Sequence, residues 1–158
     1  MDQKVKEQRI STLGHIGLQQ FAPYLMNRIM GRYNANLRDD FRKQGLTISQ
    51  VRTLAVLSVS DGVTVNHLAI YTVIEQSTLS RTLDALEAQG LVRREQGETD
   101  SRVRRVFLTD DGRAEFARAW PSMHQEFETM FADIDDHEYA AFVATLQKVL
   151  HNVRRHEI

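Results

Sequence analysis

The sequence contains no cysteine among its 158 residues. This absence excludes disulfide bonds, thiolate nucleophiles, thiol-based redox sensing and sulfur-ligated zinc. No segment approaches the run of about 18 apolar residues that a transmembrane helix requires. The charged amino-terminal segment also lacks the apolar region of a signal peptide. We therefore expect a soluble, cytoplasmic protein that has no membrane partner.

The sequence also lacks the groups of residues that are typical of a catalytic site. The eight glycines are scattered singly, so no glycine-rich loop is available to hold a phosphate group. We find no nucleophile with a neighbouring base and no candidate acid–base pair of carboxylates. His124 with Glu126 and Glu128 is the one grouping that resembles a metal site, but no two histidines have the i, i+4 spacing of a strong one. We expect a protein that is not an enzyme and that uses no cofactor or metal.

The net charge is close to zero, but the charges are unevenly distributed. Lys and Arg number 20 and Asp and Glu number 21, giving a formal net charge of -1, which by itself does not indicate a nucleic-acid partner. Residues 91–108 contain five arginines and three acidic residues, whereas residues 126–138 contain six acidic residues and no Lys or Arg. Positive charge is therefore concentrated in one short stretch.

The apolar pattern predicts a mainly α-helical chain with a small β-hairpin. A long helix is expected from Leu13 to Phe41, in which Pro23 marks a kink or an early break. Gly45 ends it, and three short helices are expected to follow. The first begins after Thr47 or Ser49 and ends before the turn at residues 61–62, and the second is capped by Thr64. The third fits the segment QSTLSRTLDALEAQG at residues 76–90, with Gly90 at the expected C-cap.

A hairpin and two further helices complete the prediction. Residues 91–96 and 103–108 are strand-like and are joined by the turn-forming residues 97–102. Thr109 caps a helix that extends to Ile134, with a kink expected at Pro121. The last helix, around residues 139–153, has the most regular helical spacing of apolar residues in the chain.

Three short helices followed by a hairpin form a winged helix-turn-helix, and the residues within it are more specific than the order alone. The segment LAIYTVIEQSTLSRTLDALEAQGLVRR at residues 68–94 is followed by the pattern D-x-R-x5-L-T-x2-G. That pattern comprises Asp100, Arg102, Leu108, Thr109 and Gly112. Together these features resemble the MarR (multiple-antibiotic-resistance regulator) family of transcription factors.

The resemblance implies an organisation and a function. Residues 1–158 would form a single subunit with a winged helix-turn-helix at 45–112 and dimerisation helices at 10–44 and 113–156. The expected protein is a homodimeric, sequence-specific regulator of transcription, a ligand-responsive repressor that binds a palindromic operator in double-stranded DNA. The alternative is a winged helix that serves only protein–protein contacts, but such a module has no need of arginines in its wing.

The resemblance also implies which residues contact DNA. Arg102 stands at the family's minor-groove arginine, and Asp100 at an acid that orients arginines, with Arg94 as its expected partner. Gln76 and Arg81 have side chains suited to reading bases. The complete set of candidate DNA-binding residues is Gln76, Ser77, Thr78, Ser80, Arg81, Arg94, Asp100, Arg102, Arg104 and Arg105.

Two positions depart from the family pattern, and five residues are candidates for an effector site. Val73 stands where the family often has glycine, and because valine is β-branched, a positive φ at this position would be strained. Glu75 stands at the position where the family usually has a Ser or Thr helix cap. A small aromatic or amphipathic effector, as in other members of the family, would bind between the dimerisation helices and the DNA-binding unit. For each candidate the alternative, which residue type alone favours, is ordinary packing in the core or the dimer interface. The candidates for that site are Tyr24, Met30, Tyr33, Trp120 and Met123.

Overall fold

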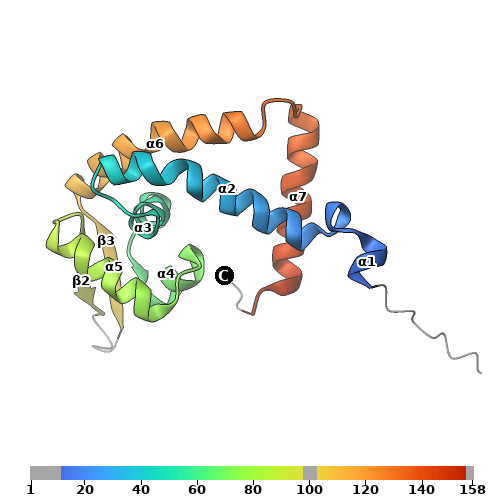
Figure 1. The fold of residues 1–158 in the computed structure, drawn as a ribbon. Coiled ribbons are helices and arrows are strands. Elements are labelled where there is room, and N and C mark those ends of the chain that lie inside the picture. The colour runs from blue at the N-terminus through green and yellow to red at the C-terminus, as the bar shows by residue number, and fades with distance from the viewer. Residues whose placement is uncertain (1–11, 98–102, 156–158) are drawn as a thin grey trace, which may run out of the picture. The chain divides into compact units, whose positions relative to one another are not determined.

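The computed structural model describes residues 12–97 and 103–155 (Figure 1). Helices dominate the chain, and a small antiparallel sheet takes one strand from between the third and fourth α-helices and two strands from between the fifth and sixth. The chain divides into two compact units, Met1–Asn36 and Leu37–Ile158, and helix α2 contributes residues to both. The mainly helical fold class with a small β-structure is confirmed.

The first unit contains short helices where the apolar pattern predicted one long helix. Helix α1 (Leu13–Ile16) and the 3-10 helix η1 (Leu18–Gln20) are separated by Gly17, which has a φ of 78°. Helix α2 (Ala22–Lys43) then begins immediately before Pro23. Proline is tolerated in the first turn of a helix because the N–H that it lacks has no partner there. The long helix expected from Leu13 is therefore interrupted before Pro23, and of the two expectations at this proline the early break is confirmed.

The winged helix-turn-helix forms the centre of the second unit. Its helices are α3 (Ile48–Val59), α4 (Val65–Thr72) and α5 (Gln76–Ala88), and its wing consists of β2 (Val92–Gln96) and β3 (Arg104–Leu108). The expected caps form: Thr47 makes a capping box with Gln50, and the Thr64 hydroxyl accepts a hydrogen bond from the backbone N–H of His67. These local interactions explain why the helix starts could be predicted from the sequence.

Leucines and valines from all these elements meet in one core. The leucine and valine side chains with less than 2% exposed are Leu54, Leu57, Leu68, Leu79, Leu83, Leu86, Val51, Val92 and Val106. Burying each of them contributes about 1.5–3 kcal/mol of hydrophobic free energy. The core thus holds the three helices and the wing in a fixed arrangement.

The sheet has a third strand that the sequence analysis missed. Strand β1 (Val63–Thr64) pairs with β3, so the strand order is β1-β3-β2 and all pairs are antiparallel. Two residues are too few to show the alternation of a strand. The predicted hairpin therefore supplies the central strand β3 and the edge strand β2 of a three-stranded sheet.

The Leu-Thr-x-x-Gly pattern at the end of β3 joins the wing to the next helix, α6 (Asp110–Met130). The Thr109 hydroxyl donates to the Gly90 carbonyl at 2.7 Å and accepts from the Gly112 N–H at 2.9 Å. A Cβ atom on Gly112 would lie 2.0 Å from the Leu91 carbonyl oxygen, so only glycine fits there. The pattern therefore has a structural purpose in addition to its value as a family signature.

The carboxyl-terminal part of the second unit consists of α6 and α7 (Asp136–Val153). Helix α6 continues through Pro121 and ends at Met130, four residues before the predicted end at Ile134. No residue of α7 is buried, although its apolar residues have regular helical spacing. Among the residues that the structure describes, no helix combines the length and the apolar character needed to cross a membrane.

Candidate nucleic-acid interface

Helix α5 presents one apolar and one polar face. Leu79, Leu83 and Leu86 are at most 1% exposed and anchor the helix to the core. All five recognition-helix candidates are exposed: Gln76, Ser77, Thr78, Ser80 and Arg81. The helix therefore offers hydroxyl, amide and guanidinium groups from its amino-terminal half to a partner.

The turn between α4 and α5 is strained. Val73 has φ 53° and ψ 44°, the left-handed conformation, and its side chain is 83% exposed. Its N–H donates to the Ile70 carbonyl at 3.2 Å, so the turn ends α4 in the usual way despite the β-branched residue. Glu75 is the N-cap of α5, but its side chain makes no capping hydrogen bond. Both departures noted in the sequence therefore leave the helix-turn-helix intact.

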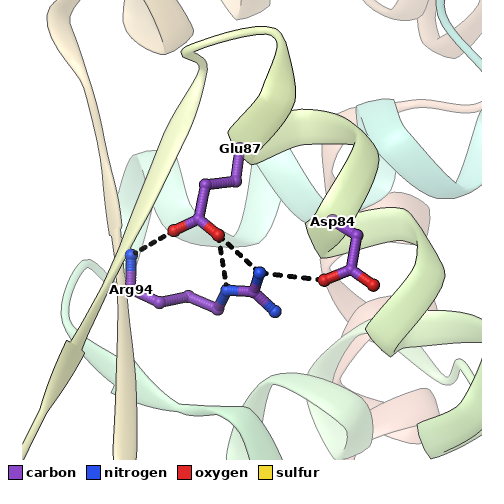
Figure 2. Close-up of polar contacts among 3 residues, drawn as sticks. All are labelled: Asp84, Glu87 and Arg94. Atoms are coloured by element: carbon purple, nitrogen blue, oxygen red, sulfur yellow. Dashed lines mark hydrogen bonds and ion pairs between the residues drawn. The ribbon is translucent and has the colours of Figure 1, made fainter.

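Arg94 connects the wing to the recognition helix (Figure 2). Its Nε donates to Glu87 Oε2 at 2.9 Å, its backbone N–H donates to Glu87 Oε1 at 3.1 Å, and its Nη2 forms ion pairs with both Glu87 and, at 2.8 Å, Asp84. The Arg94 side chain is only 20% exposed. The described partners of Arg94 are thus carboxylates of α5, whereas the sequence analysis expected Asp100.

The ion pair between Arg94 and Glu87 shifts the pKa of both groups. Hydrogen bonds from the Arg94 side chain hold the pKa of Glu87 below its ordinary value of 4.5, against the opposing effect of burial. The same hydrogen bonds with Glu87 raise the pKa of Arg94. Both groups are therefore charged across the physiological pH range, and the cluster persists there.

The wing arginines lie on two faces of the sheet. Arg104 is on the same face as Arg94, and it lines an open groove beside the first turn of α4. Arg105 is on the opposite face, where its Nη1 donates to the Gly62 carbonyl at 2.8 Å. Arg93, also on that face, lies over the Phe107 ring at 4.5 Å and pairs with Glu95. Arg93, Arg104 and Arg105 are all exposed, although Arg93 and Arg105 also contact neighbours within the fold, whereas Arg94 is largely covered.

Asp100 and Arg102 lie outside the described residues. Their predicted positions at the tip of the wing stay predictions, and so does the pairing of Asp100 with Arg94. The strands that lead to the tip are described on both sides, up to Gly97 and from Val103.

Two polar residues at this site were missed in the sequence analysis. The Asp61 carboxylate accepts hydrogen bonds from the backbone N–H of Leu108 at 2.8 Å and from Arg113 Nη2 at 2.7 Å, which fixes the base of the wing. Asn66, in the first turn of α4, accepts a hydrogen bond from Gln76 Nε2 at 3.0 Å. Their partners are 10 to 52 residues away, and no periodicity or turn signal identifies such contacts.

The effector candidates fall into two groups. Trp120 and Met123 line an open, largely apolar groove of about 520 Å³ between α3 and α6, together with Phe116 and Val59. The other three candidates, Tyr24, Met30 and Tyr33, belong to the first compact unit. In residues 12–97 and 103–155, no group of three or more His, Asp or Glu side chains is placed to hold a metal ion.

Comparison with known proteins points to one family. The sequence model of the MarR family matches residues 44–103. The chain is 53% identical to a transcriptional regulator of the MarR family from Silicibacter pomeroyi, whose crystal structure aligns with 94% of this chain and 100% of that chain at a TM-score of 0.89.

Two further regulators of transcription or DNA binding are also similar to this chain. The HTH-type transcriptional regulator YwoH of Bacillus subtilis (strain 168) is 33% identical over 98 residues, which cover 62% of this chain and 71% of that protein. The structure of BpsR from Bordetella bronchiseptica, whose DNA binding is regulated by 6-hydroxynicotinic acid, is 26% identical, covers 81% of this chain and 97% of its own, and has a TM-score of 0.71.

Proposed function

The chain belongs to the MarR family of transcriptional regulators, and we propose that it represses transcription by binding a palindromic operator in double-stranded DNA as a homodimer. The observation that carries this proposal is the exposed amino-terminal half of α5, which is rigidly supported by buried leucines. A recognition helix needs such a surface to place side chains in the major groove.

We assign the contacts by the chemistry of each side chain. Arg81 and Gln76 read base edges, whereas Ser77, Thr78 and Ser80 bind phosphate oxygens. In the wing, Arg102 enters the minor groove, and Arg104 and Arg105 bind along the backbone. Arg94 supports the wing from within, through Glu87 and Asp84, and Asp100 orients the arginines at the tip.

The flanking segments 10–44 and 113–156 supply the dimer interface in this proposal. Exposed apolar side chains along α7 support it, and the larger ones are Phe142, Val149, Leu150 and Val153. A two-fold dimer would place its recognition helices about one helical turn of DNA apart, roughly 10 base pairs. The operator is therefore expected to be a palindrome with that spacing.

A small aromatic or amphipathic effector is the proposed signal, and the groove between α3 and α6 is its candidate site. Trp120, which lines this groove, is the only tryptophan of the chain, so its fluorescence reports directly on occupancy. We expect 6-hydroxynicotinic acid or another aromatic acid to quench this fluorescence and to weaken DNA binding. Aromatic acids that leave both quantities unchanged would count against the effector site.

DNA binding is tested by fluorescence anisotropy with DNA from the region upstream of the gene and with a scrambled duplex. We expect tight binding to the native duplex that weakens steeply between about 50 and 200 mM salt, because phosphate contacts release counterions. Arg81→Ala should lose about 1–3 kcal/mol of binding free energy and relax the sequence preference. Gln89→Ala, an exposed residue at the carboxyl end of α5 to which no DNA or dimer contact is assigned, is the control. Equal, weak binding to both duplexes would instead favour a protein-interaction module.

A further inference from the structure

A single side-chain hydrogen bond links the exposed starts of α4 and α5. Gln76 is the first residue of α5, and its Nε2 donates to Oδ1 of Asn66 in the first turn of α4 at 3.0 Å. Both side chains are exposed. A hydrogen bond between exposed amides replaces bonds to water and adds little to stability. Its main effect is therefore on the orientation of Gln76.

The bond to Asn66 determines which groups of Gln76 remain available. A glutamine amide has two N–H donors and a carbonyl acceptor. Because one N–H donates to Asn66 Oδ1, the amide of Gln76 is held in this orientation as long as that acceptor faces it. Gln76 then offers one N–H donor and one carbonyl acceptor, side by side, to a partner in front of α5.

Among the bases, adenine complements this arrangement in the major groove. Adenine presents an N7 acceptor next to an N6 amino donor. Guanine presents two acceptors, cytosine offers an amino donor without a neighbouring acceptor, and thymine an acceptor beside a methyl group. The remaining N–H of Gln76 can donate to N7 while its carbonyl accepts from N6. All the donors and the acceptor of the glutamine amide are then used.

We propose that Asn66 is a positioning residue that holds the Gln76 amide in the orientation that reads adenine. This inference rests on the proposed function, in which α5 enters the major groove. Asn66 also lines the open groove of about 400 Å³ that contains Arg104 and Thr64. The DNA backbone that flanks the reading helix would pass here, so a carboxylate at position 66 would meet phosphate groups.

The experiment is selection of binding sites from a randomised DNA duplex library, followed by affinity measurements on the selected sites. Wild-type protein should select adenine at one position of each half-site. Asn66→Ala and Gln76→Ala should each lose about tenfold of the discrimination at that position. The double variant should lose no more than either single variant, because the two residues act as a unit.

Asn66→Asp distinguishes positioning from a general loss of structure. Aspartate keeps the acceptor for Gln76, so the adenine preference should persist while affinity falls for every sequence because of phosphate repulsion. Gln89→Ala, at the opposite end of α5, should select the wild-type motif with wild-type affinity. Thermal melting of each variant checks that the fold is retained.

The possible failures are distinguishable. If wild-type protein enriches no sequence, the proposed function fails and this inference fails with it. If wild-type protein selects a clear motif that Asn66→Ala retains at every position, the inference is overturned and the proposed function stands. A motif that changes in Gln76→Ala but not in Asn66→Ala would likewise assign base reading to Gln76 without positioning by Asn66.

Discussion

At the residue scale, the turn between α4 and α5 illustrates how tertiary structure overrides local preference. Val73 has the left-handed conformation, which costs an L-residue roughly 1–2 kcal/mol and is worse for a β-branched one. The neighbouring Ile74 is buried and Leu79 starts the apolar face of α5. Packing of these side chains holds the turn in place and offsets the strain at Val73.

Val73→Gly is expected to stabilise the protein by about 1 kcal/mol, because glycine adopts a positive φ without steric cost. Urea denaturation measures the change. Val59→Gly is the control, since Val59 is equally exposed, at 85%, but lies in the last turn of α3. Glycine in a helix costs up to about 1 kcal/mol, so the control should be destabilised. A loss of stability in Val73→Gly would show that the left-handed turn does not carry strain.

At the element scale, the wing is attached to α5 by more than the short turn between them. Arg94 brings a backbone N–H and a guanidinium group from β2 to Glu87, and Asp84 completes the cluster (Figure 2). The single positive charge of Arg94 thereby offsets one of the two carboxylate charges on the recognition helix. This arrangement fixes the wing relative to α5 and reduces negative charge on a surface that would face DNA phosphates.

Glu87→Gln is expected to lower stability at pH 7 and to make stability less dependent on pH in the acid range. The pKa of Glu87 is lower in the folded protein than its ordinary value of 4.5, so ionisation stabilises the fold above about pH 4.5. That contribution disappears as the pH falls through the folded-state pKa. Urea denaturation at several pH values should show the two proteins converging below pH 4.5. A difference that is constant with pH would contradict an ionic role.

At the scale of the whole molecule, basic, acidic and exposed apolar side chains are concentrated in different elements. Arginines are concentrated in the wing, whereas the acidic residues of 126–138 lie at the junction of α6 and α7. Helix α7 has no buried residue, and its apolar side chains Leu150 and Val153 are 62% and 68% exposed. An apolar stripe on a well-formed helix is typical of an interface between subunits.

Leu150→Asp is therefore expected to convert the proposed dimer to a monomer, because it places a charge in an apolar interface. Sedimentation velocity measures the change in mass. The helical content measured by circular dichroism should persist, since Leu150 is not part of the core of its own chain. Asn152→Asp, on the opposite side of the same helix, should leave the dimer intact. A wild-type protein that sediments as a monomer, or a Leu150→Asp variant that stays dimeric, would contradict this interface.

Most of the fold and the exposed part of the site could be predicted from the sequence. The caps at Thr47, Thr64 and Thr109, the strand boundaries and the polar face of α5 all depend on residues within three or four positions of one another. Such interactions leave a periodic or fixed-spacing pattern in the chain. The sequence by itself therefore determined the type and order of the elements around the wing, and with them the family.

Only the tertiary structure decided what each polar side chain of the site contacts. The pairing of Arg94 with Glu87, the hydrogen bond from Gln76 to Asn66 and the strand pairing of β1 with β3 join residues that are 7 to 43 positions apart. The distances between these partners depend on how the leucine core packs. From residue type alone, each of these side chains could have several partners. This is why the sequence could indicate Arg94 as part of the site but could not indicate its contacts with Glu87 and Asp84.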